Sequence, residues 1–262
     1  MRAITVITLI VLVSALAVNA QTPALRVLGS NGIKAVIEEL RPRIEKELGR
    51  PLSITFETST AVRQHIEAGD PFDVAVLTQE VINDLATGGK IDRLSIVELG
   101  RAGIGFGVRA GAAKPDVRTP EAVKQAMLNA KSLTWVAAGA SRAHIDHMTE
   151  ALGIASAIKS KTVLTNGVDE SNALVAGGKN EMIVTLISEI MPGKGIQYVG
   201  PLPEQFQNYV TFAAGVSSKS KLPAAGALFI KQLTVPATEA VYKAKGMEIP
   251  AGGLTPKKFV PK

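Results

Sequence analysis

Side chains that can hold an anion stand at three short turns in the first part of this sequence. Ser30-Asn31, Ser59-Thr60 and Thr78-Gln79 each follow a short apolar run and precede a segment with helical spacing. Hydroxyl and amide groups at such turns either cap the following helix or donate hydrogen bonds to a ligand. Three turns of this kind in succession favour a ligand pocket over capping alone.

A second group of polar residues stands near the start of a later helical segment. Arg142 favours a carboxylated ligand, because a guanidinium pairs in a bidentate way with a planar carboxylate; the alternative is that Arg142 and His144 are solvated residues of a first turn. His147 shares a helix face with His144, but no third ligand stands at a useful spacing for a metal. Arg63 follows Thr60 by three residues and points either into a cleft or outward.

The segments that must position these groups alternate between strand and helix. Strand-like runs at 25–28, 51–56 and 73–77 are each followed by a helical pattern, which is clearest at 33–48 and 61–68. This alternation predicts an α/β fold with an open, mainly parallel sheet flanked by helices. Ligands of such sheets sit at the carboxyl ends of the strands, where the three polar turns stand.

The rest of the chain repeats this alternation and adds two strands that cross between the halves. The predicted strands are 104–108, 133–136, 161–164, 182–186 and 209–216, and the predicted helices begin at Pro120 and span 142–152, 171–176, 223–233 and 238–245. We predict two lobes, residues 21–100 plus 210–262 and residues 101–209, with a cleft between them. Trp135 lies inside a predicted strand and is expected in the core.

The N-terminus has the pattern of a secretory signal peptide. Arg2 is followed by an apolar run from Ile4 to Leu16 and by the small-x-small site Val18-Asn19-Ala20. The run is shorter than the roughly 20 residues that cross a bilayer. We therefore predict cleavage of residues 1–20, a mature chain that begins at Gln21, a periplasmic location and no membrane insertion.

Composition excludes several function classes. The chain has no cysteine, and therefore neither disulfides nor a cysteine nucleophile. Its 29 basic and 23 acidic residues give a net charge of +6, which favours an anionic partner. The basic residues are scattered and not interleaved with aromatic ones, so a nucleic-acid groove is not expected. The sequence also lacks a G-x-S-x-G elbow, a P-loop and an H-E-x-x-H helix.

Several segments resemble the molybdate-type solute-binding proteins of ABC importers. They are Arg26 to Ser30, Thr58-Ser59-Thr60, Ile66 to Val74, the glycine-rich strand 104–108, Ala173 to Gly178 and Ile187 to Ile190. The resemblance implies a two-lobed type 2 periplasmic-binding-protein fold, a monomer without cofactor or metal, a small anionic ligand and an ABC permease as partner. In that family hydroxyls and backbone N–H groups hold the anion, which implicates Ser30 and Ser59.

The second lobe departs from the molybdate pattern. Thr185 to Ser188 stand where those proteins have a tyrosine-containing turn, and Arg142 and His144 stand before the middle helix. A neutral cage satisfies a tetrahedral oxyanion, whereas an arginine favours a carboxylate. We therefore predict that a di- or tricarboxylate, or an oxyanion, is bound by a set of seven residues: Ser30, Asn31, Ser59, Thr60, Arg142, Thr185 and Ser188.

Two functions remain open at this point. One is capture of the anion for ABC-type uptake. The other follows from the likeness to periplasmic aconitate isomerases, which are built on the same scaffold: a cofactor-independent allylic proton shift that interconverts trans- and cis-aconitate. That reaction needs one base near the carbon acid, for which His144 is the first candidate and Glu189 and Tyr209 are the next.

Overall fold

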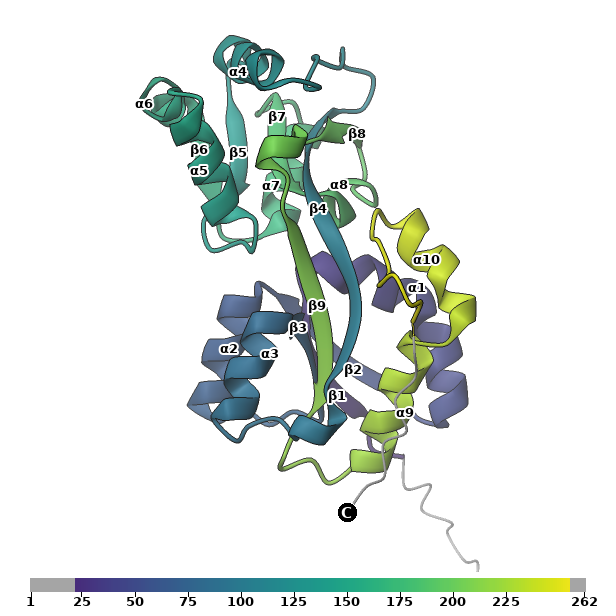
Figure 1. Cartoon of the computed structure of the whole chain (residues 1–262). Coiled ribbons are helices and arrows are strands. Elements are labelled where there is room, and N and C mark those ends of the chain that lie inside the picture. The colour runs from purple at the N-terminus through teal and green to yellow at the C-terminus, as the bar shows by residue number, and fades with distance from the viewer. Residues whose placement is uncertain (1–21, 255–262) are drawn as a thin grey trace, which may run out of the picture.

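The computed structural model describes residues 22–254, so the predicted signal peptide lies outside the described residues. In this range strands and helices alternate, and the predicted α/β class is confirmed (Figure 1). The strands are β1 Leu25–Ser30, β2 Leu52–Glu57, β3 Val74–Thr78, β4 Val97–Arg109, β5 Leu133–Val136, β6 Thr162–Thr165, β7 Met182–Leu186, β8 Ile196–Pro201 and β9 Tyr209–Val216. The helices are α1 Asn31–Leu48, α2 Ser59–Ala68, α3 Gln79–Thr87, α4 Pro120–Asn129, α5 Arg142–Ala151, α6 Ala155–Ile158, α7 Val168–Ala176, α8 Ile187–Ile190, α9 Pro223–Leu233 and α10 Glu239–Ala244.

The sheet runs through two lobes that β4 and β9 connect (Figure 1). In the first lobe β1 pairs in parallel with β2 and β3. In the second lobe β5 pairs in parallel with β6 and β7. The parallel cores agree with the prediction, but β4, β8 and β9 add antiparallel pairs, so the sheet as a whole is mixed. The predicted residue boundaries of the lobes stay predictions.

The long strand β4 begins seven residues before the predicted 104–108 run and serves both lobes. Its first half pairs with β9, and its second half pairs with β7 and β8. The glycines of the second half are required by close neighbours: a Cβ at Gly105 would lie 2.8 Å from the Gly200 carbonyl oxygen, and one at Gly107 would lie 2.9 Å from Ile183. Strand β8 was not predicted, because its segment contains Gly200 and Pro201 and shows no clear alternation.

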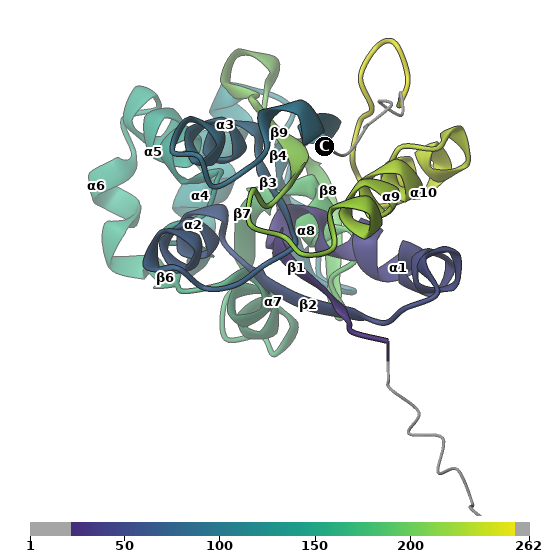
Figure 2. The same ribbon diagram turned by 90° about the horizontal axis from the view of Figure 1, so that it is seen from below.

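Helices cover both faces of the first lobe's sheet. Figures 1 and 2 show α2 and α3 on one face and α1, α9 and α10 on the other. The apolar face predicted for α1 is buried in the main core, with Ile33, Val36, Ile37, Leu40 and Ile44 at most 5% exposed. Trp135 packs in the same core, as predicted.

Two helices begin earlier than predicted, which changes the setting of the polar turns. The Thr58 hydroxyl accepts a hydrogen bond from the Ala61 N–H at 3.2 Å, so Thr58 is the N-cap of α2. Ser59 and Thr60 are therefore the first helical residues rather than loop residues. Asn31 likewise opens α1, directly after the last residue of β1.

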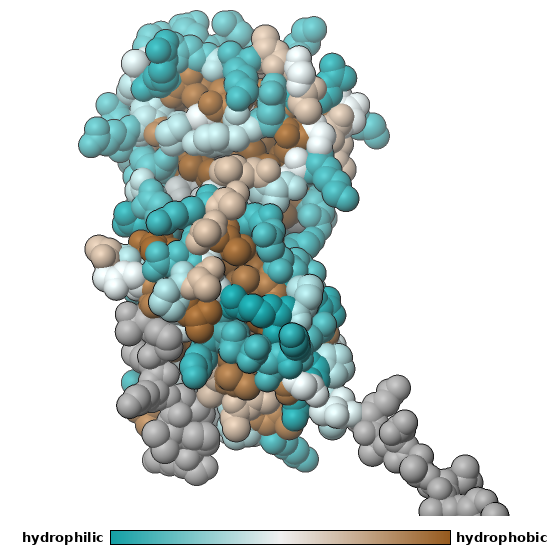
Figure 3. Space-filling model, turned by 90° about the vertical axis from the view of Figure 1, so that its right-hand side faces the viewer, coloured by the Kyte–Doolittle hydropathy of each residue, from teal (hydrophilic) through white to brown (hydrophobic). Residues whose placement is uncertain are grey.

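The surface formed by residues 22–254 carries few large apolar groups. Figure 3, which looks at the side with α1 and α10, shows hydrophilic residues over much of both lobes and apolar ones in separate places. The exposed large apolar side chains of residues 22–254 are Leu94, Val163, Leu164, Met191 and Tyr209. Within this range no helix has the length and apolar character that a membrane span requires.

Candidate functional site

A cavity of about 380 Å³ lies where the two lobes face each other. We call it the interlobe cavity. The first lobe contributes the beginnings of α2 and α3, and the second lobe contributes the β5–α5 turn and α5; β9 lies beside them. Its lining residues are Ser59, Thr60, Thr78, Gln79, Glu80, Val81, Ala138, Ala140, His144, Tyr209, Val210 and Thr211. Three segments that are far apart in the sequence therefore meet at one place.

The first-lobe wall presents hydrogen-bond donors at two helix N-termini. The buried Ser59 hydroxyl oxygen accepts a hydrogen bond from the Thr78 N–H at 3.1 Å, which leaves its own O–H to donate. No side chain caps α3, so the first-turn N–H groups from Gln79 onward lack an intrahelical partner. Backbone N–H groups and the helix dipole make such an end a binding site for anions. Glu80 also lines the cavity and is the negative group on this wall.

The second-lobe wall presents His144, the partly exposed third residue of α5. The Asn208 side-chain nitrogen lies 2.9 Å from Nδ1 and 3.1 Å from Nε2 of its ring. Asn208 directly precedes β9, one of the two connecting strands. His144 thus faces the first-lobe donors across the cavity while the connecting segment holds its ring.

Tyr209, one of the predicted base candidates, is better suited to donate a proton. Burial raises the pKa of its phenol, and the nearby Glu248 carboxylate raises it further, against an opposing effect of Arg101. The Arg101 guanidinium lies 4.2 Å from the centre of the Tyr209 ring. A phenol with a raised pKa stays protonated at neutral pH.

A second cavity, of about 730 Å³, lies between α1 of the first lobe and α7 and α8 of the second. We call it the α1–α7 cavity. Two polar contacts join the lobes near it: Lys34 Nζ lies 2.8 Å from the Asp169 carboxylate, and the Ser188 hydroxyl donates to the Gly32 carbonyl at 2.7 Å. Asn31, Ser188 and Glu189 line this cavity.

Glu189 in the α1–α7 cavity is the carboxyl group of residues 22–254 whose pKa is raised. Burial raises its pKa to about 7, against hydrogen bonds from the Thr185 hydroxyl and the Leu186 N–H, and the nearby Asp169 carboxylate adds to the rise. A carboxyl group that titrates near neutral pH can both release and accept a proton under working conditions. Glu189 therefore stays a candidate for an acid–base group.

Replacing Glu189 by glutamine should stabilise the protein at alkaline pH. The folded state holds the Glu189 proton more tightly than the unfolded state, so the free energy of unfolding falls as pH rises from about 4.5 to about 7. Glu189→Gln removes that dependence; we expect nearly equal melting temperatures at pH 4.5 and a variant more stable by about 1–3 kcal/mol at pH 8. Thermal unfolding at both pH values checks this, with Glu150→Gln as the exposed control. Parallel pH curves for wild type and Glu189→Gln would contradict it.

The structure distributes the seven predicted ligand residues over several places. Ser59 and Thr60 line the interlobe cavity together with His144, whereas Asn31 and Ser188 line the α1–α7 cavity. Ser30 is buried between β1 and α1 and lines neither. The Thr185 hydroxyl donates to the Glu189 carboxylate. Their roles as ligand contacts stay predictions.

The arginines suggested by the sequence are paired in this structure. Arg142 Nε lies 2.8 and 2.7 Å from the two carboxylate oxygens of Asp146, and Arg142 lines neither cavity. Arg63 is bound to Glu67 and Asp84 on the surface. Among residues 22–254 no group of three histidine or acidic side chains is arranged to hold a metal ion.

Asn208 is the functional candidate that sequence reasoning missed. It stands 64 residues from His144, and no local pattern connects the two. The lining residues Ala138 and Ala140 were also not predicted, because an alanine side chain bears no functional group and contributes only by leaving room for a ligand.

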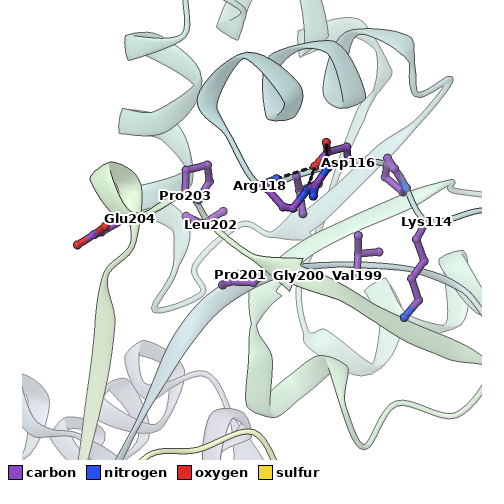
Figure 4. A pocket seen from close by; sticks show the side chains of 11 residues that line it. Lys114, Asp116, Arg118, Val199, Gly200, Pro201, Leu202, Pro203 and Glu204 are labelled. Atoms are coloured by element: carbon purple, nitrogen blue, oxygen red, sulfur yellow. Dashed lines mark hydrogen bonds and ion pairs between the residues drawn. The ribbon is translucent and has the colours of Figure 1, made fainter.

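A further pocket, of about 580 Å³, belongs to the second lobe alone. Figure 4 shows that Lys114, Asp116 and Arg118 border it on one side and Val199 to Glu204 on the other. The Arg118 guanidinium donates to both oxygens of the Asp116 carboxylate and holds its pKa well below the usual range. Since these charges satisfy each other and no predicted ligand residue lies here, the interlobe cavity is the better candidate.

Comparisons with known proteins identify a family and a relative. The family described as bacterial extracellular solute-binding protein matches residues 25–248. An aconitate isomerase from Pseudomonas sp is 29% identical over 216 residues, which cover 80% of this chain and 81% of that protein.

Solved structures show the same fold. The periplasmic molybdate-binding protein of Azotobacter vinelandii superposes with a TM-score of 0.70 at 17% identity and covers 86% of this chain and 99% of its own. The sulfate-binding protein of Mycobacterium tuberculosis superposes with a TM-score of 0.66 at 14% identity and covers 88% of each chain. The predicted type 2 periplasmic-binding-protein fold is confirmed.

Proposed function

The chain belongs to the bacterial extracellular solute-binding proteins, and on this basis we propose that it captures a small di- or tricarboxylate in the interlobe cavity. One observation carries the proposal: the N-termini of α2 and α3, with the Ser59 hydroxyl between them, face His144 of the other lobe across about 380 Å³. Donors on both lobes allow an anion to hold the lobes together.

Neutral donors would carry most of the recognition. The described lining of the interlobe cavity contains neither lysine nor arginine, and its one carboxylate is Glu80. Its other polar groups are His144, the Gln79 amide and the hydroxyls of Ser59, Thr60, Thr78, Tyr209 and Thr211. Helix N-termini bind carboxylate and oxyanion groups through N–H donors and the helix dipole. Two helix ends on one wall and a ring donor on the other suit a ligand with carboxylates at separated positions, and the similarity to an aconitate isomerase favours the same ligand class.

A second candidate function is isomerisation of aconitate, favoured by Glu189. One base removes a proton from the methylene carbon of one isomer, the double bond shifts, and a proton is added to the carbon that was the CH end of the double bond, so that no atom or electron is gained or lost. Glu189, with a pKa raised by burial to about 7, meets the requirement for such a base. His144 is the other candidate, from its place in the interlobe cavity.

The cellular setting follows from the same proposal. Residues 1–20 direct secretion to the periplasm, where the mature monomer closes on its ligand and delivers it to an ABC permease. The lobes comprise residues 21–100 with 210–262 and residues 101–209. Interlobe contacts such as Lys34–Asp169 and Ser188–Gly32 belong to the closed form.

The test mixes the mature protein separately with trans-aconitate, cis-aconitate and molybdate. Chromatography follows interconversion, and the melting temperature of each mixture reports binding, because a ligand that binds only the folded state stabilises it. Stabilisation by the aconitates without turnover supports capture, and turnover supports the isomerase. Stabilisation by molybdate alone would contradict the carboxylate proposal.

A further inference from the structure

The segment that follows α10, residues 245–248, runs along one of the two connecting strands. The N–H of Arg101 in β4 donates to the Glu248 carbonyl, and the Glu248 N–H donates to the Arg101 carbonyl, both at 2.8 Å. On its other edge β4 pairs with β9, where Arg101 lies opposite Thr211. A third segment of the chain therefore lies beside the two connecting strands where the lobes join.

Side chains strengthen this attachment to the connecting strands. The Glu248 carboxylate accepts hydrogen bonds from Nε and Nη2 of Arg101 at 3.0 and 2.8 Å. The Arg101 guanidinium in turn lies against the ring of Tyr209, which belongs to β9 and lines the interlobe cavity. A Cβ at Gly100 would lie 2.9 Å from the Glu248 carbonyl oxygen, so this glycine lets the segment approach β4.

The same segment is attached to helices of the first lobe. Lys245 Nζ lies 2.6 Å from the Glu39 carboxylate of α1. The N–H of Met247, which is 2% exposed, donates to the Tyr242 carbonyl of α10 at 3.0 Å. Figures 1 and 2 show α10 beside α1. These contacts fix residues 245–248 relative to the first lobe.

Gly246 brings this segment against the second lobe. Its φ is +76°, and a Cβ there would lie 2.8 Å from Cγ2 of Ile187 and 2.8 Å from Sδ of Met191. Ile187 opens α8 of the second lobe, and Met191 is the C-cap residue of that helix. The close approach of α8 therefore depends on the absence of a side chain at residue 246.

We propose that residues 245–248 form a third connection between the lobes and hold them at the angle of this structure, with Gly246 as the positioning residue at the contact with α8. A segment fixed to the first lobe and to β4 stops the approach of α8, because packed groups resist compression. A side chain at residue 246 pushes α8, and the second lobe with it, away. The inference deepens the proposed function and rests on it, since the lobe angle sets the distance between the two walls of the interlobe cavity.

Distances between two spin labels, one on each lobe, give a direct test. The chain has no cysteine, so Glu47→Cys in α1 and Ser160→Cys in the second lobe provide two labels at exposed positions. In ligand-free protein we expect Gly246→Ala to shift the distance between the labels from its wild-type value. The same distance in labelled wild type and labelled Gly246→Ala would overturn the proposal.

Two further variants separate the contact with α8 from backbone strain. Gly153 also follows a helix directly and has a φ of +68°, but a Cβ there meets nothing within 4 Å, so Gly153→Ala is the matched control. It should leave the distance unchanged, and an equal shift in this variant would overturn the proposal. Ile187→Ala removes the Cγ2 atom that the new methyl group meets, so Gly246→Ala with Ile187→Ala should recover the wild-type distance. If Gly246→Ala alone fails to fold, recovery of folding in the double variant supports the contact, and failure of both overturns it.

A titration with trans-aconitate separates this inference from the proposed function. If wild type binds, Gly246→Ala should lower the affinity about tenfold and Gly153→Ala should not, because only molecules whose lobes stand at the binding angle bind. Equal affinities of Gly246→Ala and wild type would overturn the positioning role of Gly246. If wild type does not bind while the label distances shift as expected, the third connection stands and the carboxylate ligand is refuted.

Discussion

Replacing Gly32 by alanine should destabilise the protein and weaken ligand binding together. A Cβ at this position would lie 2.4 Å from Cζ of Phe212 and 2.8 Å from Cδ1 of Leu186, and neither side chain can move aside, because Phe212 is 0% and Leu186 2% exposed. Gly32 also accepts the interlobe hydrogen bond of Ser188. Overpacking of this kind destabilises by about 1–3 kcal/mol.

The same substitution tests lobe closure. Gly32 belongs to the first lobe, Leu186 ends a strand of the second and Phe212 lies on connecting strand β9, so the added methyl group pushes the lobes apart. We expect the affinity for trans-aconitate to fall about tenfold or more, equivalent to about 1.4 kcal/mol. Gly252→Ala is the matched control, because a Cβ there meets nothing within 4 Å. Calorimetric titration and thermal unfolding of both variants check this, and a Gly32→Ala protein equal to wild type in both would contradict it.

Replacing Ser59 by alanine should lower the affinity for the anion without a comparable loss of stability. The substitution removes a hydroxyl that lines the interlobe cavity and leaves the Thr78 N–H without its acceptor. A hydrogen bond to a charged group contributes about 1.5–3 kcal/mol, so we expect the dissociation constant to rise about ten- to hundredfold. The freed Thr78 N–H lies at the cavity and can be hydrated, which limits the effect on folding.

The control for Ser59→Ala is Ser53→Ala, an exposed serine of the neighbouring strand β2. Titration of both variants with trans-aconitate separates a local role of the Ser59 hydroxyl from a general effect of losing a serine. An unchanged dissociation constant in Ser59→Ala would show that the anion is bound elsewhere, and the α1–α7 cavity would become the next site to test.

The sequence predicts strands and helices correctly where burial of one face gives the apolar residues a regular spacing. The apolar face of α1, the parallel runs β1 and β3, and the core position of Trp135 all follow from local spacing. Features that depend on distant partners were missed or misplaced. Strand β8 exists because β4 offers it a partner, and α2 begins at Ser59 because the Thr58 side chain caps it.

In the candidate site, too, features with a local sequence signal were predicted, and features that depend on distant partners were not. Ser59 and Thr60 are recognisable because parallel strands end at one edge, which gathers their polar turns. The ion pair of Arg142 was not predicted. Its partner Asp146 stands one turn further along the same helix and competes with any ligand for the guanidinium group. The contact between Asn208 and His144 depends on how the connecting strand lies against the second lobe, which spacing does not encode.

The measurement that tests the central claim most directly is a titration of ¹⁵N-labelled mature protein with trans-aconitate, followed by the backbone amide signals. The account predicts saturation at one ligand per chain, with the largest shifts at Thr60, Gln79 and Glu80, whose N–H groups open the two helices of the interlobe cavity. Largest shifts at Asn31, Val168 and Asn172 would place the ligand in the α1–α7 cavity instead. That outcome, or spectra that do not change, would contradict the proposal that the interlobe cavity captures a carboxylate.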